Sequence, residues 1–357
     1  MCMIIKFKKN IIKFYLCIFA TFLLFACSNN SSFTKGDINS STNTRYDYKS
    51  IKDGEKNIII NKDFGTDIKD IVIFSTNDGM SSFNDNLTLS NIKHFVDHFD
   101  RNNNFVVFVD TGNFSYGDEA SKNSNGKSSI EILNLAEYDI VVPGSFEFNY
   151  GIDTLIENMN SLNAHVVCCN IYDIKNNKLA FAPYVIYKLG NINVGFVGVT
   201  SPDAMFIKNN YENFFDKDGN QLIYLFDDEN GNALYGQVQN AVDSCIANGA
   251  DKVILLSHLG IEGINEVWSS INVIKNTKGI DAVIDGHSME VLDNGLMLNK
   301  VGQFIPLVQA GSNYKYLGAI NITKEDYINQ AVLKERSVNT KDEKFQTQID
   351  EILNKYK

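Results

Sequence analysis

The sequence predicts an α/β domain built from short apolar strands that alternate with amphipathic helices. From Ile68 onward, runs rich in Val, Ile and Phe recur between stretches that have the period of a helix. An apolar content of 44% in 357 residues is enough for a sizeable core. The chain has only 4 Pro, and none of them marks a hinge between domains. We therefore expect one layered α/β domain over about residues 68–335.

In its first half, this domain alternates predicted strands with predicted helices. The strand patterns are Ile71–Phe74, Phe105–Val109, Ile140–Val142 and Val166–Cys169. The helical patterns are Leu89–Phe99, Ile130–Ala136 and Ile152–Leu162. Such alternation favours a sheet with helices packed against it.

The second half supplies another set of strands and a helix at the end. The strand patterns are Val185–Lys188, Val194–Val199, Val253–Leu256, Ala282–Ile284, Phe304–Val308 and Leu317–Ile322, and helices are predicted near Leu234–Ala247 and Ile261–Lys275. Within residues 336–357, apolar side chains recur at helical spacing from Phe345 to Tyr356. We expect this last segment to be a helix that docks on the domain.

The first 26 residues have the features of a secretory signal. Lys6, Lys8, Lys9 and Lys13 precede an apolar stretch, Phe14–Ala26, that is too short to span a bilayer as a stable helix. Leu24-Phe25-Ala26-Cys27 resembles a bacterial lipobox.

Cleavage before Cys27 would leave a lipidated cysteine, which attaches the chain to the bacterial cell envelope on the extracytoplasmic side. The alternative is an uncleaved membrane anchor. Residues 27–67 are mostly polar and predict a flexible tether.

Charge and cysteine content exclude two classes of protein. The formal net charge is −11, and removing the signal removes lysines and no acids, so an anchored domain this acidic is a poor nucleic-acid binder. Cys168, Cys169 and Cys245 are too few for a disulfide framework. We expect them to be buried free thiols.

Polar segments follow several of the apolar runs and carry a resemblance to a known family. They are Ser75–Met80, Val109–Asn113, Pro143–Gly151, Ser257–Gly260 and Asp285–Met289. In order and context they resemble the metal-binding loops of the calcineurin-like metallophosphoesterases, most closely the 5′-nucleotidase branch. Gln309-Ala310-Gly311 and Tyr316-Leu317-Gly318 extend the match.

This resemblance implies a fold, a chemistry and a further domain. The fold is a four-layer α/β/β/α sandwich of two mixed sheets flanked by helices. The chemistry is hydrolysis of phosphate esters by two divalent metals about 3.5 to 4 Å apart. In the 5′-nucleotidases a second domain follows and supplies the aromatics that bind the nucleoside, and we expect no counterpart of it here.

At the positions of the metal ligands, the resemblance holds only in part. Asp78, His258 and His287 match family ligands. Met80 and Met289 replace histidines, and a thioether is a poor ligand for hydrolytic dications.

Two further replacements affect the bridging ligand and a metal-binding asparagine. Asn113 replaces the aspartate that would bridge the two metals, and its neutral amide does little to offset their repulsion. Ser145 replaces the metal-binding asparagine.

The third loop also lacks the catalytic group that the resemblance implies. Phe146 replaces the histidine that would protonate the leaving group, and a phenyl ring has no proton to give. Glu147 matches a glutamate that supports the loop. No residue is therefore assigned a catalytic role.

The surviving ligands predict one divalent ion, Zn or Mn, rather than two. Asp78, His258 and His287 form a 2-His-1-carboxylate set, which holds a single ion readily, and the Asn113 oxygen is a further donor. The open alternative is that both histidines are hydrogen-bonded core residues. Asp203, Asp285 and Glu290 are the nearest other side chains by sequence. His94 and His98 lie on the polar face of their helix, where we expect solvent.

Three hypotheses for function follow from these observations. The first, which the replacements favour, is a lipid-anchored and catalytically impaired phosphoesterase-like domain that binds a small phosphate-containing ligand or a protein partner. The second is an active metal-dependent phosphohydrolase with a reduced site. The third is a lipoprotein whose outer surface makes all its contacts and whose cleft binds nothing.

Overall fold

The computed structural model describes residues 59–60, 68–83, 88–207, 210–261, 265–334 and 337–357. The predicted signal peptide, Cys27 and most of the predicted tether therefore lie outside the described residues. Within the described part of the chain, no helix is both long and apolar enough to cross a bilayer.

A mixed six-stranded sheet forms the first half of the domain. Its order is β16-β15-β2-β3-β4-β5. The strands are β2 (Asp70–Thr76), β3 (Asn104–Asp110), β4 (Ile140–Val141), β5 (His165–Val166), β15 (Leu317–Ile322) and β16 (Ile328–Leu333). β2 to β5 are parallel, and β15 returns antiparallel to β2. Their β-branched runs are buried on both faces, as is typical of a parallel sheet covered by helices.

A mixed seven-stranded sheet forms the second half, in the order β1-β8-β9-β11-β12-β14-β13. The strands are β1 (Ile59–Ile60), β8 (Tyr184–Leu189), β9 (Ile192–Thr200), β11 (Lys252–His258), β12 (Ala282–Asp285), β13 (Val291–Leu298) and β14 (Phe304–Ala310). A small separate sheet joins β6 (Ile171–Asp173), β7 (Lys178–Leu179) and β10 (Ile223–Leu225).

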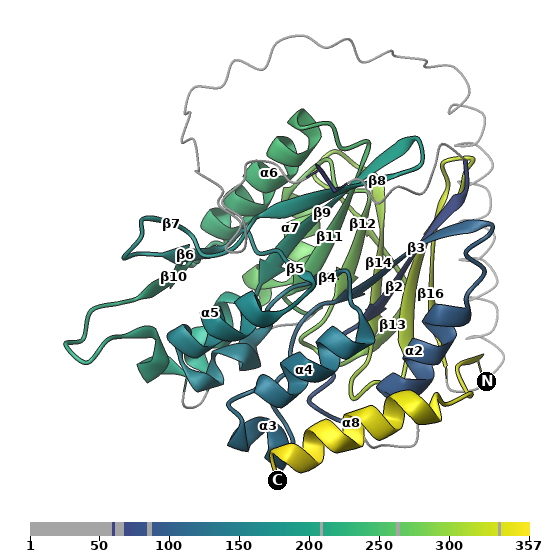
Figure 1. Ribbon diagram of the computed structural model, residues 1–357. Helices are drawn as coiled ribbons and strands as arrows, with labels where there is room; N and C mark the ends of the chain where they lie inside the picture. The colour runs from purple at the N-terminus through teal and green to yellow at the C-terminus, as the bar shows by residue number, and fades with distance from the viewer. Residues whose placement is uncertain (1–58, 61–67, 84–87, 208–209, 262–264, 335–336) are drawn as a thin grey trace, which may run out of the picture. The chain divides into compact units, whose positions relative to one another are not determined.

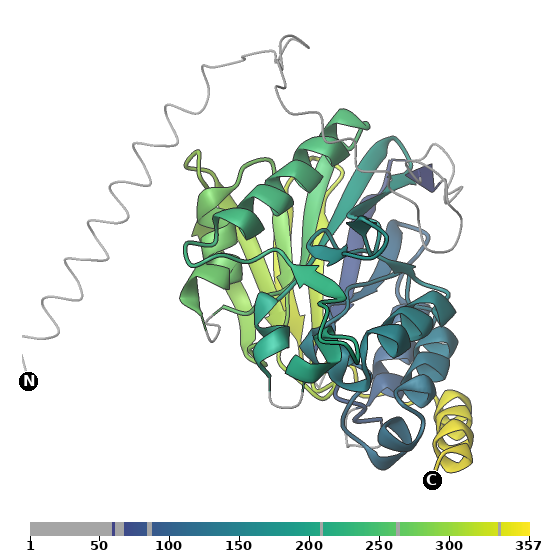
Figure 2. The same cartoon turned by 90° about the vertical axis from the view of Figure 1, so that its left-hand side faces the viewer.

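Helices cover the outer face of each sheet, which gives four layers (Figures 1 and 2). The six-stranded sheet carries α2 (Leu89–His98), α3 (Glu119–Asn123), α4 (Lys127–Ala136), α5 (Ile152–Ser161) and α8 (Glu343–Lys355). The seven-stranded sheet carries α6 (Asn232–Ala247) and α7 (Ser270–Asn276). Short 3₁₀ turns are η1 (Ser145–Tyr150), η2 (Pro202–Phe206), η3 (Tyr211–Phe214) and η4 (Glu266–Trp268). A third apolar cluster fills the space between the sheets. The predicted four-layer α/β/β/α fold is confirmed.

Two predicted elements have wrong boundaries. The helix predicted at Ile261–Lys275 starts at Ser270, because Ser269 caps it by accepting from the Asn272 N–H. The strand predicted at Val166–Cys169 ends at Val166, because the N–H groups of Cys168 and Cys169 bond across to the Ala182 and Gly198 carbonyls. The chain there passes from one sheet to the other.

Several smaller predictions are confirmed. α8 buries Phe345, Ile349 and Leu353 and is capped by the Asp342 side chain, so the last segment is a docked helix. All three described cysteines are free and buried. Burial raises the pKa of Cys168 and of Cys245 to about 12, which keeps both as inert thiols.

Candidate functional site

The site lies where strands of both sheets end. Loops follow the carboxyl ends of β2, β3 and β4 in one sheet and of β9, β11, β12 and β14 in the other. This end of a sheet is where α/β proteins bind ligands. All five polar segments singled out in the sequence meet here.

The loop backbones are strained at the candidate residues. Asp78, Met80, Asn113, His287 and Met289 all have positive φ, between 49° and 75°. Non-glycine residues rarely adopt this conformation and persist in it only where the surrounding structure enforces it. The surrounding structure therefore holds these five residues in a strained loop backbone.

Glycines allow the two halves of the site to approach. A Cβ on Gly144 would lie 2.4 Å from the backbone N of Asn113 and 2.8 Å from Cε1 of His258. A Cβ on Gly112 would lie 2.8 Å from His258 Nδ1. Only glycine fits at these two positions.

Asp78 and Asn113 are bonded to each other on the six-stranded side of the site. Asn113 Nδ2 donates to Asp78 Oδ1 at 2.8 Å, and Asn113 Oδ1 accepts from the Phe146 N–H at 2.8 Å. These two bonds fix the orientation of the amide. A hydrogen-bond donor thus faces Asp78 from the position of the family's bridging aspartate.

The other oxygen of Asp78 is also satisfied by N–H groups. Oδ2 accepts from Asn77 Nδ2 at 2.8 Å and from the His287 backbone N–H at 2.7 Å. Burial raises the pKa of Asp78, although these donors favour its charged form. Asn77 also bonds the backbone of Ala310 and Gly311, so it joins the two sheets at this point.

Glu147 holds together the loops on the same side of the site. Its carboxylate accepts from the backbone N–H groups of Asn113, Phe114, Ser115 and Gly144 and from the Ser115 hydroxyl, at 2.6 to 3.0 Å. The side chain is 2% exposed and all its donors belong to the site loops. This geometry agrees with the supporting role predicted for it.

His258 presents a free imidazole nitrogen on the seven-stranded side. Its Nδ1 lies 2.5 Å from the Thr111 carbonyl oxygen, which can only accept, so Nδ1 carries the proton and Nε2 a lone pair. Burial and the neighbouring His287 lower the pKa of His258 to about 3, so the ring is neutral. Nε2 is buried and has no partner among the described residues.

His287 makes an ion pair that the sequence did not predict. Its Nε2 lies 2.9 Å from Asp203 Oδ2, and its Nδ1 lies 3.4 Å from Ser145 Oγ. Burial opposes the charge on His287, but Asp203, Asp78 and Asp285 outweigh it and raise the pKa. The bond to His287 likewise overcomes burial and lowers the pKa of Asp203. Both shifts favour the charged pair.

The three side chains expected near the cleft have different positions. Asp203, at the start of η2, is in the site as described above. Asp285 lies beneath the loops, where it accepts from Leu259 and Gly260, and burial raises its pKa to about 6. Glu290 is exposed, and its backbone N–H donates to Gln309. Only Asp203 extends the site.

The replaced positions bring apolar groups to the rim. The Phe146 and Tyr116 rings lie with centroids 5.7 Å apart, and the Met80 backbone N–H donates to the Asn113 carbonyl beside them. Met289 is 41% exposed. The side chains of Phe146, Met80 and Met289 cannot transfer a proton or bind a hard cation.

The donors present do not fit the family's two-metal centre. Among the described residues, no three His, Cys, Asp or Glu side chains are grouped so that they could hold a metal ion. Asp78 already receives three N–H donors, and the His287 imidazole faces Asp203. The predicted set of Asp78, His258 and His287 is thus close in space, but these donors do not face a common point. The ligand assignment, with Asn113 as a further donor, stays a prediction.

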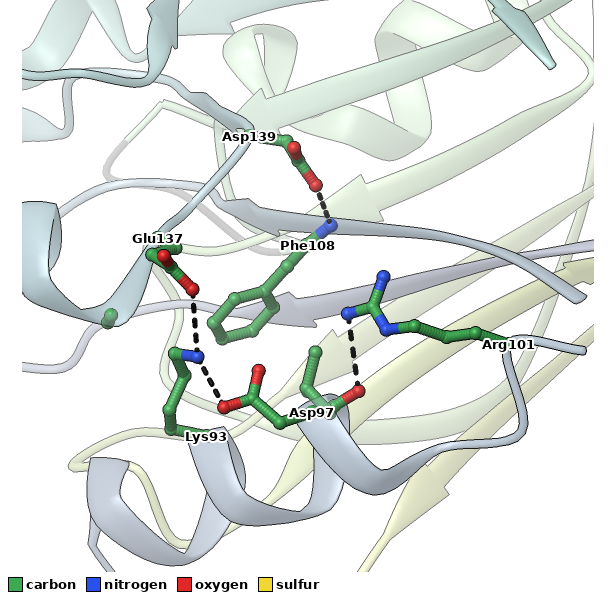
Figure 3. A pocket seen from close by; sticks show the side chains of 8 residues that line it. Lys93, Asp97, Arg101, Phe108, Glu137 and Asp139 are labelled. Atoms are coloured by element: carbon green, nitrogen blue, oxygen red, sulfur yellow. Dashed lines mark hydrogen bonds and ion pairs between the residues drawn. The ribbon is translucent and has the colours of Figure 1, made fainter. Parts of the chain in front are cut away.

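A separate concavity of about 230 Å³ lies between α2 and the end of α4 (Figure 3). Lys93 there is 7% exposed and binds Asp97 and, at 3.1 Å, Glu137. Figure 3 shows Lys93 between these two carboxylates. Its charge is already balanced by these neighbours, so we assign this concavity no ligand.

Of the histidines outside the site, His94 and His98 stack on α2 with ring centroids 4.1 Å apart. His98 is exposed and bonds the His94 carbonyl through Nδ1. These are contacts of a surface helix, as expected.

Comparison with curated proteins finds relatives among nucleotide phosphoesterases, although no family model matches the chain. The chain is 29% identical over 227 residues to the trifunctional nucleotide phosphoesterase protein YfkN of Bacillus subtilis, covering 55% of this chain and 14% of YfkN. It is 24% identical over 240 residues to the snake venom 5′-nucleotidase of Naja atra and 27% over 237 residues to the 5′-nucleotidase of Bos taurus. These matches cover 62% and 61% of this chain but only 41% and 38% of those enzymes.

Comparison with solved structures finds the same fold. The calcineurin-like phosphoesterase YfkN from Bacillus subtilis superposes with a TM-score of 0.62 at 21% identity, over 80% of this chain and 97% of that one. The 5′-nucleotidase precursor from Thermus thermophilus gives 0.64 at 18% identity, over 80% of this chain and 58% of that one. The resemblance seen in the loop motifs is confirmed. The described domain has the fold of the calcineurin-like phosphoesterases and is similar in sequence to the N-terminal domain of the 5′-nucleotidases.

Proposed function

We propose that this chain is a 5′-nucleotidase-like phosphoesterase domain that has lost most of its catalytic capacity and is retained to bind a ligand or partner. The observation that carries the proposal is the 2.8 Å bond from Asn113 Nδ2 to Asp78 Oδ1. In a two-metal site both groups would face cations, whereas here an internal hydrogen bond satisfies the carboxylate. Phe146, in the position of the proton donor, adds to this argument.

The charges and the apolar rim of the site bear on which class of ligand it would bind. In this site, the charged imidazole of His287 would attract the phosphate group of a small ligand. The carboxylates of Asp78 and Asp203 would repel the same phosphate group. A protein partner meets no such penalty at the apolar rim. We expect phosphate-containing ligands to bind weakly and nucleic acid not at all.

We also propose that the chain is attached to the extracytoplasmic face of a bacterial membrane through lipid on Cys27. The support is the lipobox-like sequence Leu24-Phe25-Ala26-Cys27. Labelled fatty acid supplied to the producing cells should appear in the mature protein, and Cys27→Ser should abolish the label.

A second candidate function is an active phosphohydrolase with a single Zn or Mn ion. It is favoured by the buried lone pair of His258 Nε2, which neutral imidazole commonly offers to a metal. His287 would first have to leave Asp203. With such an ion bound, Asp78, His258 and His287 would be its holders, and the ion would supply Lewis acidity.

Phosphate release separates the two candidates. The purified chain is assayed on AMP, ADP, ATP and p-nitrophenyl phosphate with Mn, Zn, Co or Mg, beside a double variant with His258→Ala and His287→Ala. We expect no metal-dependent release above the double variant. Turnover that needs metal and is lost in the double variant would refute the first proposal and establish the second.

A further inference from the structure

Exposed apolar side chains gather at the end of the domain opposite the site. The site loops follow the carboxyl ends of the parallel strands in both sheets, so the amino ends of those strands lie together at the other end. The apolar group there, which we call the hairpin face, consists of Ile68, Leu296, Leu298, Val301, Phe304 and Tyr327. Each of these side chains is 50% to 70% exposed.

Most of these side chains lie on two hairpins that are in contact. β13 and β14 form one hairpin, in which Leu298 is opposite Phe304, with Val301 in the turn. β15 and β16 form the other, with Tyr327 in its turn. Gln330 on β16 donates to the Gly295 carbonyl on β13 at 2.9 Å, which joins the hairpins (Figure 1).

Ile68 continues this surface on the neighbouring strand. It lies just before β2, and the Lys324 backbone N–H in the β15–β16 turn donates to Asp70 Oδ1 at 3.0 Å. The side chains of the hairpin face therefore come from both sheets and lie at the same end of the domain. Several large exposed apolar side chains gathered at one end of a domain indicate an interaction surface.

The charges around the face suit an interface between water and lipid. Lys69 follows Ile68 in the sequence, and the exposed Lys300 lies in the β13–β14 turn beside Val301. The acids of the β15–β16 turn are already engaged, Asp326 by Lys252 at 2.8 Å and Glu325 by Lys324 at 4.0 Å. Apolar side chains with flanking lysines are the pattern by which proteins lie on an anionic bilayer.

We propose that the hairpin face rests on the membrane surface to which the chain is anchored, so that the site points away from the bilayer. The inference rests on the proposed lipid at Cys27. About 30 residues separate Cys27 from Ile59, where β1 joins the seven-stranded sheet, and a tether of that length with the predicted flexible composition has a root-mean-square span of roughly 30 Å. It holds the domain near the bilayer at a millimolar effective concentration, at which even a weak apolar surface is occupied.

Quenching by brominated phospholipid tests which end of the domain meets the bilayer. The chain has one native tryptophan, Trp268, which is 9% exposed and gives a constant background. Phe304→Trp places a reporter on the hairpin face. Tyr211→Trp is the matched control, because Tyr211 is 56% exposed and lies next to Asn210, which bonds the site loop.

Both variants are studied as the full lipidated chain in anionic vesicles, with flotation to confirm that the acyl group holds each in the membrane. We expect quenching of the Phe304→Trp reporter to exceed that of the control at least threefold, and to fall when Val301→Asp is added. Equal quenching of the two reporters, or no quenching, with intact flotation would overturn the inference but not the lipid anchor. A dimer that covers the hairpin face would also overturn the inference. Loss of flotation altogether would show that the anchor itself is wrong and would remove the inference with it.

Discussion

The two halves of the site differ in how far their carboxylate and imidazole groups are satisfied by hydrogen bonds within the chain. On the six-stranded side, every oxygen of Asp78 and Glu147 accepts from a nearby N–H or O–H group. On the seven-stranded side, His258 Nε2 and Asp203 Oδ1 are buried without partners in the described part of the chain. In the first half both carboxylates are satisfied by internal bonds, although the Thr111 and Tyr314 hydroxyls have no partner among the described residues. In the second half a histidine nitrogen and a carboxylate oxygen still offer lone pairs.

The two half-sites therefore differ in the lone pairs that they leave for a ligand. Asn113, which stands where the resemblance implies a bridging aspartate, donates to Asp78 and stabilises that carboxylate without any cation. On the other side, His258 Nε2 keeps a buried lone pair without a partner among the described residues. Variants that strengthen or weaken each half therefore test the comparison directly.

The largest effect is expected at Glu147. Glu147→Ala removes the acceptor for five buried donors on the site loops. It should lower the free energy of unfolding by about 3 to 5 kcal/mol, because buried donors are left unpaired. Denaturant unfolding measures this, with Glu157→Ala as the control, since Glu157 pairs with Lys127 at the surface. A loss equal to that of the control would show that the first half is not held together by these bonds.

A smaller effect is expected when the bridging carboxylate is restored. Asn113→Asp places a second acid against Asp78, so without metal the domain should lose about 2 to 3 kcal/mol of stability through repulsion of buried like charges. Mn²⁺ should recover part of this loss.

Thermal unfolding in chelator and in Mn²⁺ provides the measurement. Asn113→Ser is the control, because it removes the amide without adding charge and should not respond to Mn²⁺. If the Asn113→Asp variant unfolds at the wild-type temperature in chelator, the bond from Asn113 to Asp78 does not stabilise the site without metal.

Local patterns were sufficient to predict much of the fold. Strands such as β2 and β3 are runs of β-branched residues buried on both faces, and the loops after them carry recognisable motifs, so both could be read from neighbours in sequence. The start of α7 could not be predicted in this way. It depends on Ser269 acting as the N-cap, whereas the helical spacing of apolar residues continues through Ser269 without a break. β13 and β16 were also missed.

Within the site, sequence predicted which residues meet but not what they bond. The loop motifs identified Asp78, Asn113, His258 and His287. The pairing of His287 with Asp203 joins residues 84 positions apart and depends on how η2 turns after β9. The role of Asn77 was likewise missed, although its place beside Asp78 in a polar loop was a signal for it.

The smallest effect concerns the ion pair on the open half. Asp203→Asn removes the carboxylate that raises the pKa of His287, so burial should then bring that pKa below its ordinary value of 6.5. The chain has only 5 His, so NMR titration can follow each ring. The matched control is Asp251→Asn, which changes an exposed acid near the other end of the domain. If the His287 pKa is the same in wild type and in Asp203→Asn, the pair does not form in solution.

The same variant has a defined pH dependence of stability. A raised pKa on His287 stabilises the fold below pH 6.5, and this contribution is lost as pH rises through the folded pKa. A lowered pKa on Asp203 stabilises it above pH 3.8, and that contribution is lost as pH falls through the folded pKa. The penalty of Asp203→Asn should therefore be largest between these limits, at about 1 to 2 kcal/mol for a charged hydrogen bond that solvent partly reaches, and shrink on either side. A penalty that does not vary with pH would mean that Asp203 acts by packing alone, and the two halves of the site would then differ less than the bond pattern indicates.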